Sequence, residues 1–549
     1  MMTSVKTMTE KLNKVALIVA LVHWVISFFT DRIIFTYVLF DFSTVKSVLR
    51  SIEAWGVKAV FGVFLVALWQ WIFWMAGKAD RRFLKVAGGY FLLMAVLLLL
   101  TWPGIWRMDE FGILSSSIQL FPHFWQNYIT SVFYIIALML VPVPAGVVLV
   151  QCACISLIVA RVVTLCTKPG KGWLMFLPFL MFPVLDSNLY PIRMSLYAFL
   201  ELLLVAELFF FWKDRQRAAG AHKSRTPGYW AGLTVLAAVV TIWRTESIYY
   251  LVAYPVLLLM LGKGRRYGKQ ILCYIILTVI LFAPQKIGEK ITSGDQYELT
   301  SVVLPLVPLV EAAAENGDEQ LLSVIDSVIN VEATLKGASE GKTGINLFWG
   351  DYNISEEEDK FQRSYNDAQF AEFKSAFYKL ILKYPEVFLA ERWQTFWNSC
   401  DLLENTTDLF VKDDVPNYET FQSYPLSGPV HDGIRTSVIK ILELREKQNY
   451  NVKMPAADAV YNVVPAVLVL LGTAVFLLAK RKWTLLVLVL TVLAKVPLVF
   501  LTAPSRLFMY YYSVYLIGYC VLFYVLCCTS LRFKAVRCAK SGKAGENHG

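Results

Sequence analysis

The chain has 549 residues, of which 57% are hydrophobic and 17% are charged, with a formal net charge of +10. A soluble protein of this length could not bury so much apolar surface, so the composition excludes an ordinary soluble enzyme and predicts a polytopic membrane protein. The positive charge would also suit nucleic acid, but the cations cluster in short segments between apolar runs. That distribution is the positive-inside pattern of membrane proteins, and it requires no nucleic-acid partner.

Apolar segments long enough to cross a bilayer predict roughly twelve membrane-spanning helices. They lie near residues 15–30, 54–76, 86–103, 145–165, 172–185, 194–212, 228–243, 247–262, 270–284, 462–479, 483–503 and 507–528. The basic segments between and after them are 78–85, 213–225, 263–269, 480–482 and 532–543. With a cytoplasmic N-terminus, every basic segment falls on the cytoplasmic face, and so does the C-terminus. The sequence therefore predicts a multi-pass, all-α protein of the cell (plasma) membrane.

The spacing of the apolar segments divides the chain into membrane and polar parts. The parts are an N-terminal two-helix membrane segment at 1–85, a membrane core at 86–284, an extracytoplasmic domain at 285–457, C-terminal transmembrane helices at 458–530 and a basic cytoplasmic tail at 531–549. Phe373, Phe377 and Leu380 recur at helical spacing, which predicts that the extracytoplasmic domain is rich in α-helix. The segment from His123 to Val141 predicts a helix partly embedded at the outer face.

Two adjacent carboxylates, Asp109 and Glu110, directly follow an apolar run and lie in the predicted outer loop 104–127. A carboxylate beside a transferred group can take a proton from an attacking hydroxyl. Its neighbour can coordinate a divalent cation, Mg or Mn, so this pair is also the candidate metal site. His123, in the same loop, is a candidate second base or ligand. The structural alternative is a solvated pair at the membrane interface.

Arginines stand at the predicted outer ends of spans, against the usual cytoplasmic bias. Arg193, Arg244 and Arg506 are therefore candidate phosphate ligands, because a guanidinium is a planar, permanently charged fork that matches phosphate oxygens. Glu246, two residues after Arg244, is a candidate accessory residue. The structural alternatives are that Arg244 and Glu246 pair with each other and that Arg506 reaches the lipid headgroups.

The order of these parts resembles the integral-membrane glycosyltransferases of the GT-C type, the superfamily of protein mannosyltransferases and lipid A aminoarabinose transferases. Members carry an acidic residue or pair in the first large outer loop, followed by a partly embedded helix, and segments 102–110 and 123–141 look like that pattern. The later segments 243–246 and 503–506 look similar to outer turns of the family. Two spans precede the expected first helix, and the His-Pro-Pro element of many bacterial members is absent.

The resemblance implies transfer of a hexose or pentose from a polyprenyl-phosphate carrier to a cell-envelope acceptor on the extracytoplasmic face. It implies Asp109 as the leading catalytic base, with Glu110 assisting or binding metal. A transporter or flippase of lipid-linked or anionic solutes is the alternative, since a similar number of helices suits a carrier. A carrier usually has two related halves, whereas here about nine predicted spans precede the polar domain and about three follow it.

Overall fold

The protein is built from α-helices and short 3-10 helices. The computed structural model describes residues 13–166, 173–217, 226–261, 267–292, 296–350, 360–399, 418–446 and 454–545. Within these ranges there is no β-strand, and the one isolated β-bridge joins Ile329 to Gln362. The all-α prediction is therefore confirmed for the described part of the chain.

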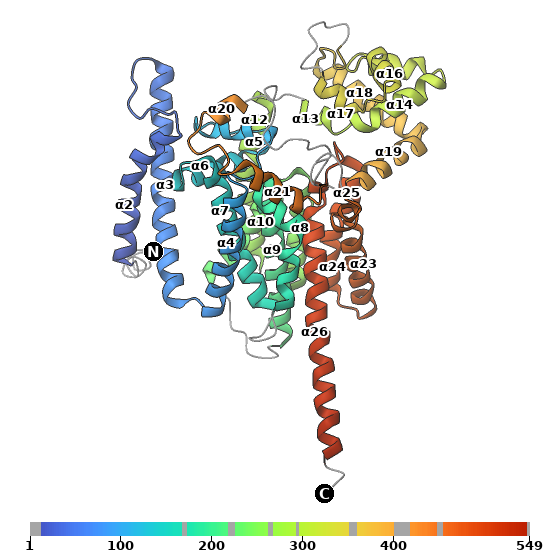
Figure 1. Ribbon diagram of the computed structural model, residues 1–549. Helices are drawn as coiled ribbons and strands as arrows, with labels where there is room; N and C mark the ends of the chain where they lie inside the picture. Colours follow the sequence, from blue (N-terminus) through green and yellow to red (C-terminus); the bar gives the residue numbers. More distant parts are fainter. Residues whose placement is uncertain are drawn as a thin grey trace.

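Most of the helices form one long bundle (Figure 1). Its members are α2 (Lys14–Thr30), α3 (Val45–Lys78), α4 (Arg81–Leu100), α5 (Met108–Ser117), α6 (Tyr128–Leu140), α7 (Pro144–Cys166), α8 (Phe182–Leu189), α9 (Arg193–Arg217), α10 (Pro227–Trp243), α11 (Tyr250–Leu261), α12 (Gly268–Thr292), α22 (Pro455–Val460), α23 (Val464–Ala479), α24 (Trp483–Leu493), α25 (Lys495–Thr502) and α26 (Tyr512–Gly545). Short 3-10 helices connect some of them: η1 (Asp31–Ile33), η2 (Trp173–Leu180), η3 (Thr245–Ser247) and η7 (Phe508–Tyr510).

Among the described residues, 8 helical segments are long and apolar enough to cross a membrane. They are Lys14–Ile33, Val45–Lys78, Arg81–Leu100, Pro144–Cys166, Arg193–Gln216, Gly268–Thr292, Pro455–Ala479 and Trp483–Thr502. Shorter apolar helices cover Tyr128–Leu140, Pro227–Trp243, Thr245–Leu261 and Tyr512–Cys528. The apolar segments of the sequence thus mark the positions of real helices.

Prolines divide two of the predicted spans. The segment predicted at 172–185 is not one helix but η2 followed by α8, with Pro178 inside the first and Pro183 in the first turn of the second. The segment predicted at 483–503 changes from α24 to α25 at Ala494. Pro497 has no N–H to donate to the carbonyl of Leu493, which explains the change of helix.

The basic ends of the long helices lie together at the lower end of Figure 1, where the C-terminus also lies. Lys78 ends α3 and Arg81 begins α4 at this end. The turn from Arg481 to Lys482 joins α23 to α24 there as well. The acid pair of α5 lies at the opposite, upper end.

The upper right of Figure 1 is occupied by a separate group of helices. These are α13 (Gln296–Thr300), α14 (Val303–Glu315), α15 (Glu319–Asp326), α16 (Val331–Ser339), α17 (Gly344–Gly350), α18 (Asp367–Lys383) and α19 (Pro385–Asn398). They have their own hydrophobic core, in which Phe373, Phe377 and Leu380 are buried. The helix predicted from these residues is confirmed, and Tyr384–Pro385 ends it.

The chain then returns to the bundle and covers its upper end. Phe421 in α20 (Tyr418–Gln422) packs on Trp106 and Phe111, with ring centroids 5.3 and 4.7 Å away. Arg435 in α21 (Asp432–Leu442) donates a hydrogen bond of 3.0 Å to the carbonyl of Gly104. These two helices therefore lie over α5 and its preceding loop rather than with α14–α18.

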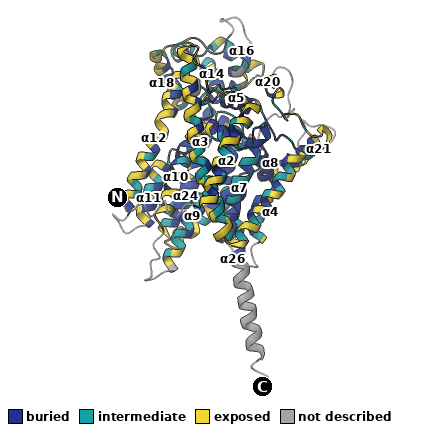
Figure 2. Cartoon of the chain, turned by 90° about the vertical axis from the view of Figure 1, so that its left-hand side faces the viewer, coloured by how far each residue is buried: buried dark blue, intermediate teal, exposed yellow. Residues whose placement is uncertain are grey.

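Figure 2 shows how burial varies among the helices of the bundle. Residues of α7 are largely buried, whereas α12 exposes apolar side chains such as Val279 and Ile280, at 59% and 60%. Exposed aliphatic surface of this extent is expected on helices that face lipid.

Candidate functional site

The two acids begin α5 and point in different directions. Arg107 is the residue before the helix, and Asp109 and Glu110 stand in its first turn, where the helix dipole favours negative charge. Glu110 is 2% exposed, whereas the side chain of Asp109 remains accessible to solvent. Adjacent residues on a helix lie about 100° apart around its axis, so the two carboxyl groups have different environments.

Asp109 is held by neighbours from two other segments. The side-chain amide of Gln126 donates a hydrogen bond of 2.7 Å to its Oδ2 atom. Burial raises the pKa of Asp109, while the charge of Arg193 and the Gln126 hydrogen bond act to lower it. Solvent reaches this carboxylate although protein atoms surround it closely enough to change its pKa. That combination suits a group that lies inside the protein and still meets a small molecule.

Glu110 is the deeper of the two acids. Burial, together with the nearby charge of Asp109, raises the pKa of Glu110 to about 8. Glu110 therefore keeps a proton near neutral pH. Asp109 is the more exposed of the two carboxyl groups, so it is the one that a small molecule can reach.

Backbone contacts place Arg193 beside Asp109. The amide of Ile105, in the loop before α5, donates a hydrogen bond of 2.9 Å to the carbonyl of Leu189. Tyr134 of α6 donates one of 2.8 Å to the carbonyl of Pro191. The segment between α8 and α9 is thus fixed between α6 and the loop before α5, and Arg193 is the first residue of α9.

A second set of contacts brings the end of α10 to the same place. Asn127, next to Gln126, donates a hydrogen bond of 2.8 Å to the carbonyl of Ile242. The indole of Trp243 donates one of 3.0 Å to Thr130. Arg244 follows Trp243 directly in the chain. The segment that contacts Asp109 through Gln126 therefore also fixes the position of Arg244.

Arg244 and Glu246 form a buried ion pair. The Nε atom of Arg244 lies 2.7 Å from Oε1 of Glu246, and Arg244 is 3% exposed. The guanidinium also lies over the rings of Tyr197 and Tyr510, 5.9 and 5.6 Å from their centroids. Burial alone would raise the pKa of Glu246, but Arg244, Lys495 and Arg193 together hold it below its usual value. The charge of Arg193 thus acts on both Asp109 and Glu246.

A fully buried ion pair between Lys495 and Glu201 lies next to the Arg244–Glu246 pair. The Nζ atom of Lys495 lies 2.6 Å from Glu201, 2.8 Å from Ser513 and 3.1 Å from the hydroxyl of Tyr197. Tyr197 in turn shares a hydrogen bond of 2.5 Å with Ser247 of η3. The pair therefore connects α9 and α25 to the short helix that carries Glu246.

Arg506 follows α25 and lies near Arg392 of α19. Its charge acts on Arg392, which is buried, pairs with Glu391 and donates a hydrogen bond of 2.8 Å to the carbonyl of Ala503. Tyr510, beside Arg244, is next in the chain to Tyr511, whose ring packs on Phe396 of α19 with centroids 5.2 Å apart. The structure thus brings Asp109, Arg193, Arg244 and Glu246 together, and it places Arg506 in a neighbouring cluster.

His123 does not contact the acid pair directly. Its Nε2 atom lies 3.4 Å from where a Cβ on Gly112 would be, one turn along α5 from Asp109. Burial lowers the pKa of His123, so the imidazole is neutral near pH 7. In this loop Gln126, rather than His123, is the hydrogen-bond partner of Asp109.

The acid pair fits a divalent metal poorly. Metal ligands must be deprotonated, and Glu110 keeps its proton near neutral pH. Across the described ranges, no three His, Cys, Asp or Glu side chains lie together as a metal site would require. Asp109 would be the single protein ligand, and it already lies within reach of the charge of Arg193.

Sequence reasoning missed Lys495 and Gln126. Lys495 is a lone cation inside the apolar run Trp483–Thr502, and an isolated charge in such a run is a signal that could have identified it. Gln126 has no comparable signal, because its role depends on a turn that only the fold defines.

Comparison of this chain with family models, with curated proteins and with solved structures found no match.

Proposed function

We propose that this protein is a membrane glycosyltransferase of the GT-C type. It transfers a sugar from a polyprenyl-phosphate carrier to a hydroxyl of a cell-envelope acceptor, in the plasma membrane and on the extracytoplasmic side. In this proposal the chain crosses the membrane roughly twelve times, with both termini in the cytoplasm. The upper end of the bundle in Figure 1 is then the extracytoplasmic end.

The observation that carries the proposal is the setting of Asp109. An accessible carboxylate accepts a hydrogen bond from Gln126, feels the charge of Arg193, and lies at the end of the bundle that also holds the Arg244–Glu246 pair. The exposed apolar helices around it would let a lipid tail remain in the bilayer while its phosphate reaches these cations.

The chemistry assigned to these residues is a single displacement. The acceptor oxygen forms a bond to the anomeric carbon, and the bond from that carbon to the phosphate oxygen breaks. Asp109 takes the proton of the acceptor hydroxyl, which removes the positive charge that would otherwise build up on that oxygen. Arg193 and Arg244 stabilise the charge on the departing polyprenyl phosphate. No step requires a metal ion.

The test uses membrane vesicles that contain the full-length protein and a panel of radiolabelled polyprenyl-phosphate hexoses and pentoses. Release of free polyprenyl phosphate is measured, since it does not depend on knowing the acceptor. We expect Asp109→Asn to reduce release by at least about a hundredfold, the usual contribution of a general base.

The matched control is Asp458→Asn. Asp458 is exposed in the first turn of α22, and it should leave release at the wild-type level. Full release by Asp109→Asn at normal protein levels would exclude Asp109 as the base. Movement of the intact labelled donor across the membrane without release would favour the transporter alternative instead.

A further inference from the structure

A cavity of about 340 Å³ lies between the loop after η1, the start of α3 and the segment after α5, at the upper end of the bundle. Its walls come from the loop after η1, the first turns of α3 and the segment that follows α5. They include Tyr37, Asp41, Lys46, Arg50, Glu53 and Gln119. None of these residues belongs to the site around Asp109.

The loop that forms one wall is fixed by a buried ion pair. Lys58 lies 2.7 Å from Asp31, and both side chains are almost completely buried. Tyr37 donates a hydrogen bond of 2.5 Å to the same carboxylate, and the amide of Thr36 donates one of 3.1 Å to the carbonyl of Ile118. The cavity is therefore preformed rather than a gap between loose chains.

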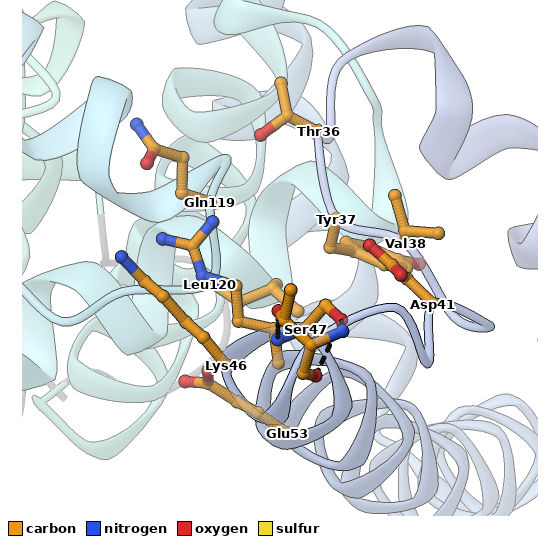
Figure 3. Close-up of a pocket in the computed structure, with 11 residues that line it drawn as sticks. Thr36, Tyr37, Val38, Asp41, Lys46, Ser47, Glu53, Gln119 and Leu120 are labelled. Carbon is orange, nitrogen blue, oxygen red and sulfur yellow. Dashed lines mark hydrogen bonds between the residues drawn. The ribbon is translucent and has the colours of Figure 1, made fainter.

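The charges around the cavity are of both signs, and Asp41 lies across the cavity from the cations. In Figure 3 the side chains of Lys46 and Gln119 lie on one side, and Asp41 lies on the other. Arg50 stands one turn along α3 from Lys46, so the two cations share one face of the helix. Glu53, three residues further on, lies on the same helix face beside Arg50. A ligand with a negative and a positive group would match this lining better than a simple anion.

The position of the cavity along α3 places it at the level of lipid headgroups. Trp55 and Trp74 are partly exposed at 38% and 54%, and indoles in membrane helices favour the two interfaces. They are separated by about 28 Å of helix, close to the thickness of a bilayer core. Arg50 lies about 7 Å beyond Trp55, which is within the headgroup layer.

An apolar stripe on α3 continues from the cavity toward the centre of the span. Its residues are strongly exposed, at 62% for Leu49, 61% for Ile52, 69% for Val60 and 73% for Val63. This stripe lies beside the face that carries Lys46 and Arg50, and it runs in the direction that acyl chains would take. The polar cavity and the apolar stripe together match the polar headgroup and the apolar chains of a lipid.

We propose that this cavity binds the headgroup of a zwitterionic phospholipid that carries a primary ammonium, such as phosphatidylethanolamine. The phosphate contacts Lys46 and Arg50, the ammonium contacts Asp41 or Glu53, and the acyl chains follow the stripe from Leu49 to Val63. The site belongs to the N-terminal helix pair, so it is independent of the proposed transfer reaction.

The experiment is native mass spectrometry of the full-length protein in detergent. The protein is titrated separately with phosphatidylethanolamine, with phosphatidylglycerol and with inorganic phosphate. We expect one tightly retained phosphatidylethanolamine, with about tenfold weaker binding in Arg50→Gln and in Glu53→Gln, as loss of one charged contact implies. Lys290→Gln is the control, because Lys290 is an exposed cation of α12 outside the cavity.

Three results would overturn the proposal. Equal retention of phosphatidylglycerol would show that the acids of the cavity do not select an ammonium. Binding of inorganic phosphate alone would show that no lipid is recognised. Equal weakening by Lys290→Gln and Arg50→Gln would show that surface charge in general, rather than this cavity, attracts the lipid. The substituted cavity residues are at the surface, so the variants should fold normally.

Discussion

Replacing Lys495 by methionine should strongly destabilise the bundle. The ammonium of Lys495 uses its three N–H groups on Glu201, Ser513 and Tyr197, at 2.6, 2.8 and 3.1 Å. Lys495 and Glu201 are 1% and 0% exposed. Removing one partner of a buried ion pair leaves an uncompensated charge, which costs about 3–5 kcal/mol.

The double variant Lys495→Met/Glu201→Leu distinguishes this explanation from simple loss of packing. It removes both charges, and we expect it to recover most of the stability lost in the single variant, because a buried pair adds little net stability over apolar residues. Thermal unfolding can be followed with a thiol-reactive fluorescent dye, since Cys152 and Cys520 are buried in the folded protein. A double variant no more stable than Lys495→Met would refute the reasoning, and so would a fully stable Lys495→Met.

The remaining predictions concern the acid pair and its neighbours. Burial and Asp109 raise the pKa of Glu110 from 4.5 to about 8, so the folded state binds this proton more tightly than the unfolded state and stability falls as pH rises through that window. At pH 7 the raised pKa of Glu110 lowers the free energy of unfolding by about 3 kcal/mol relative to acidic pH. Glu110→Gln has no such proton to lose, so its melting temperature should fall less than that of the wild type between pH 5 and pH 8. Gln126→Leu removes a hydrogen bond that lowers the pKa of Asp109, so the acidic limb of the pH–rate profile should move to higher pH. An unchanged limb would mean that Asp109 does not control the rate. Arg193→Gln should move the limb in the same direction and raise the KM for the polyprenyl-phosphate donor by about 10- to 100-fold, whereas a KM at the wild-type level would remove Arg193 from the phosphate site.

The buried Lys495–Glu201 pair also bears on the proposed reaction. Lys495 acts on Glu246 through its charge and reaches η3 through Tyr197 and Ser247. It therefore supports the Arg244–Glu246 pair without contacting a substrate. Its part in the proposed function is to position those residues.

The sequence by itself determined where the helices lie. A membrane span needs a continuous apolar run and a basic segment at its cytoplasmic end, and both are local properties that can be read without the fold. The predicted segments 145–165 and 228–243 accordingly match α7 and α10 to within one residue at each end. The local rule was too coarse at 172–185, where Pro178 and Pro183 divide an apolar run into two short helices.

Only the tertiary structure decided which charged residues meet. Glu201 and Lys495 are 294 positions apart in the chain, and no periodicity connects them. The sequence treated Arg193, Arg244 and Arg506 alike, since all three stand at helix ends. Their different neighbours depend on loops that hydrogen-bond across the bundle, such as Asn127 to the carbonyl of Ile242. Hydropathy acts along one helix, whereas the pairing of buried charges depends on how helices pack, so the candidate site could be defined only in three dimensions.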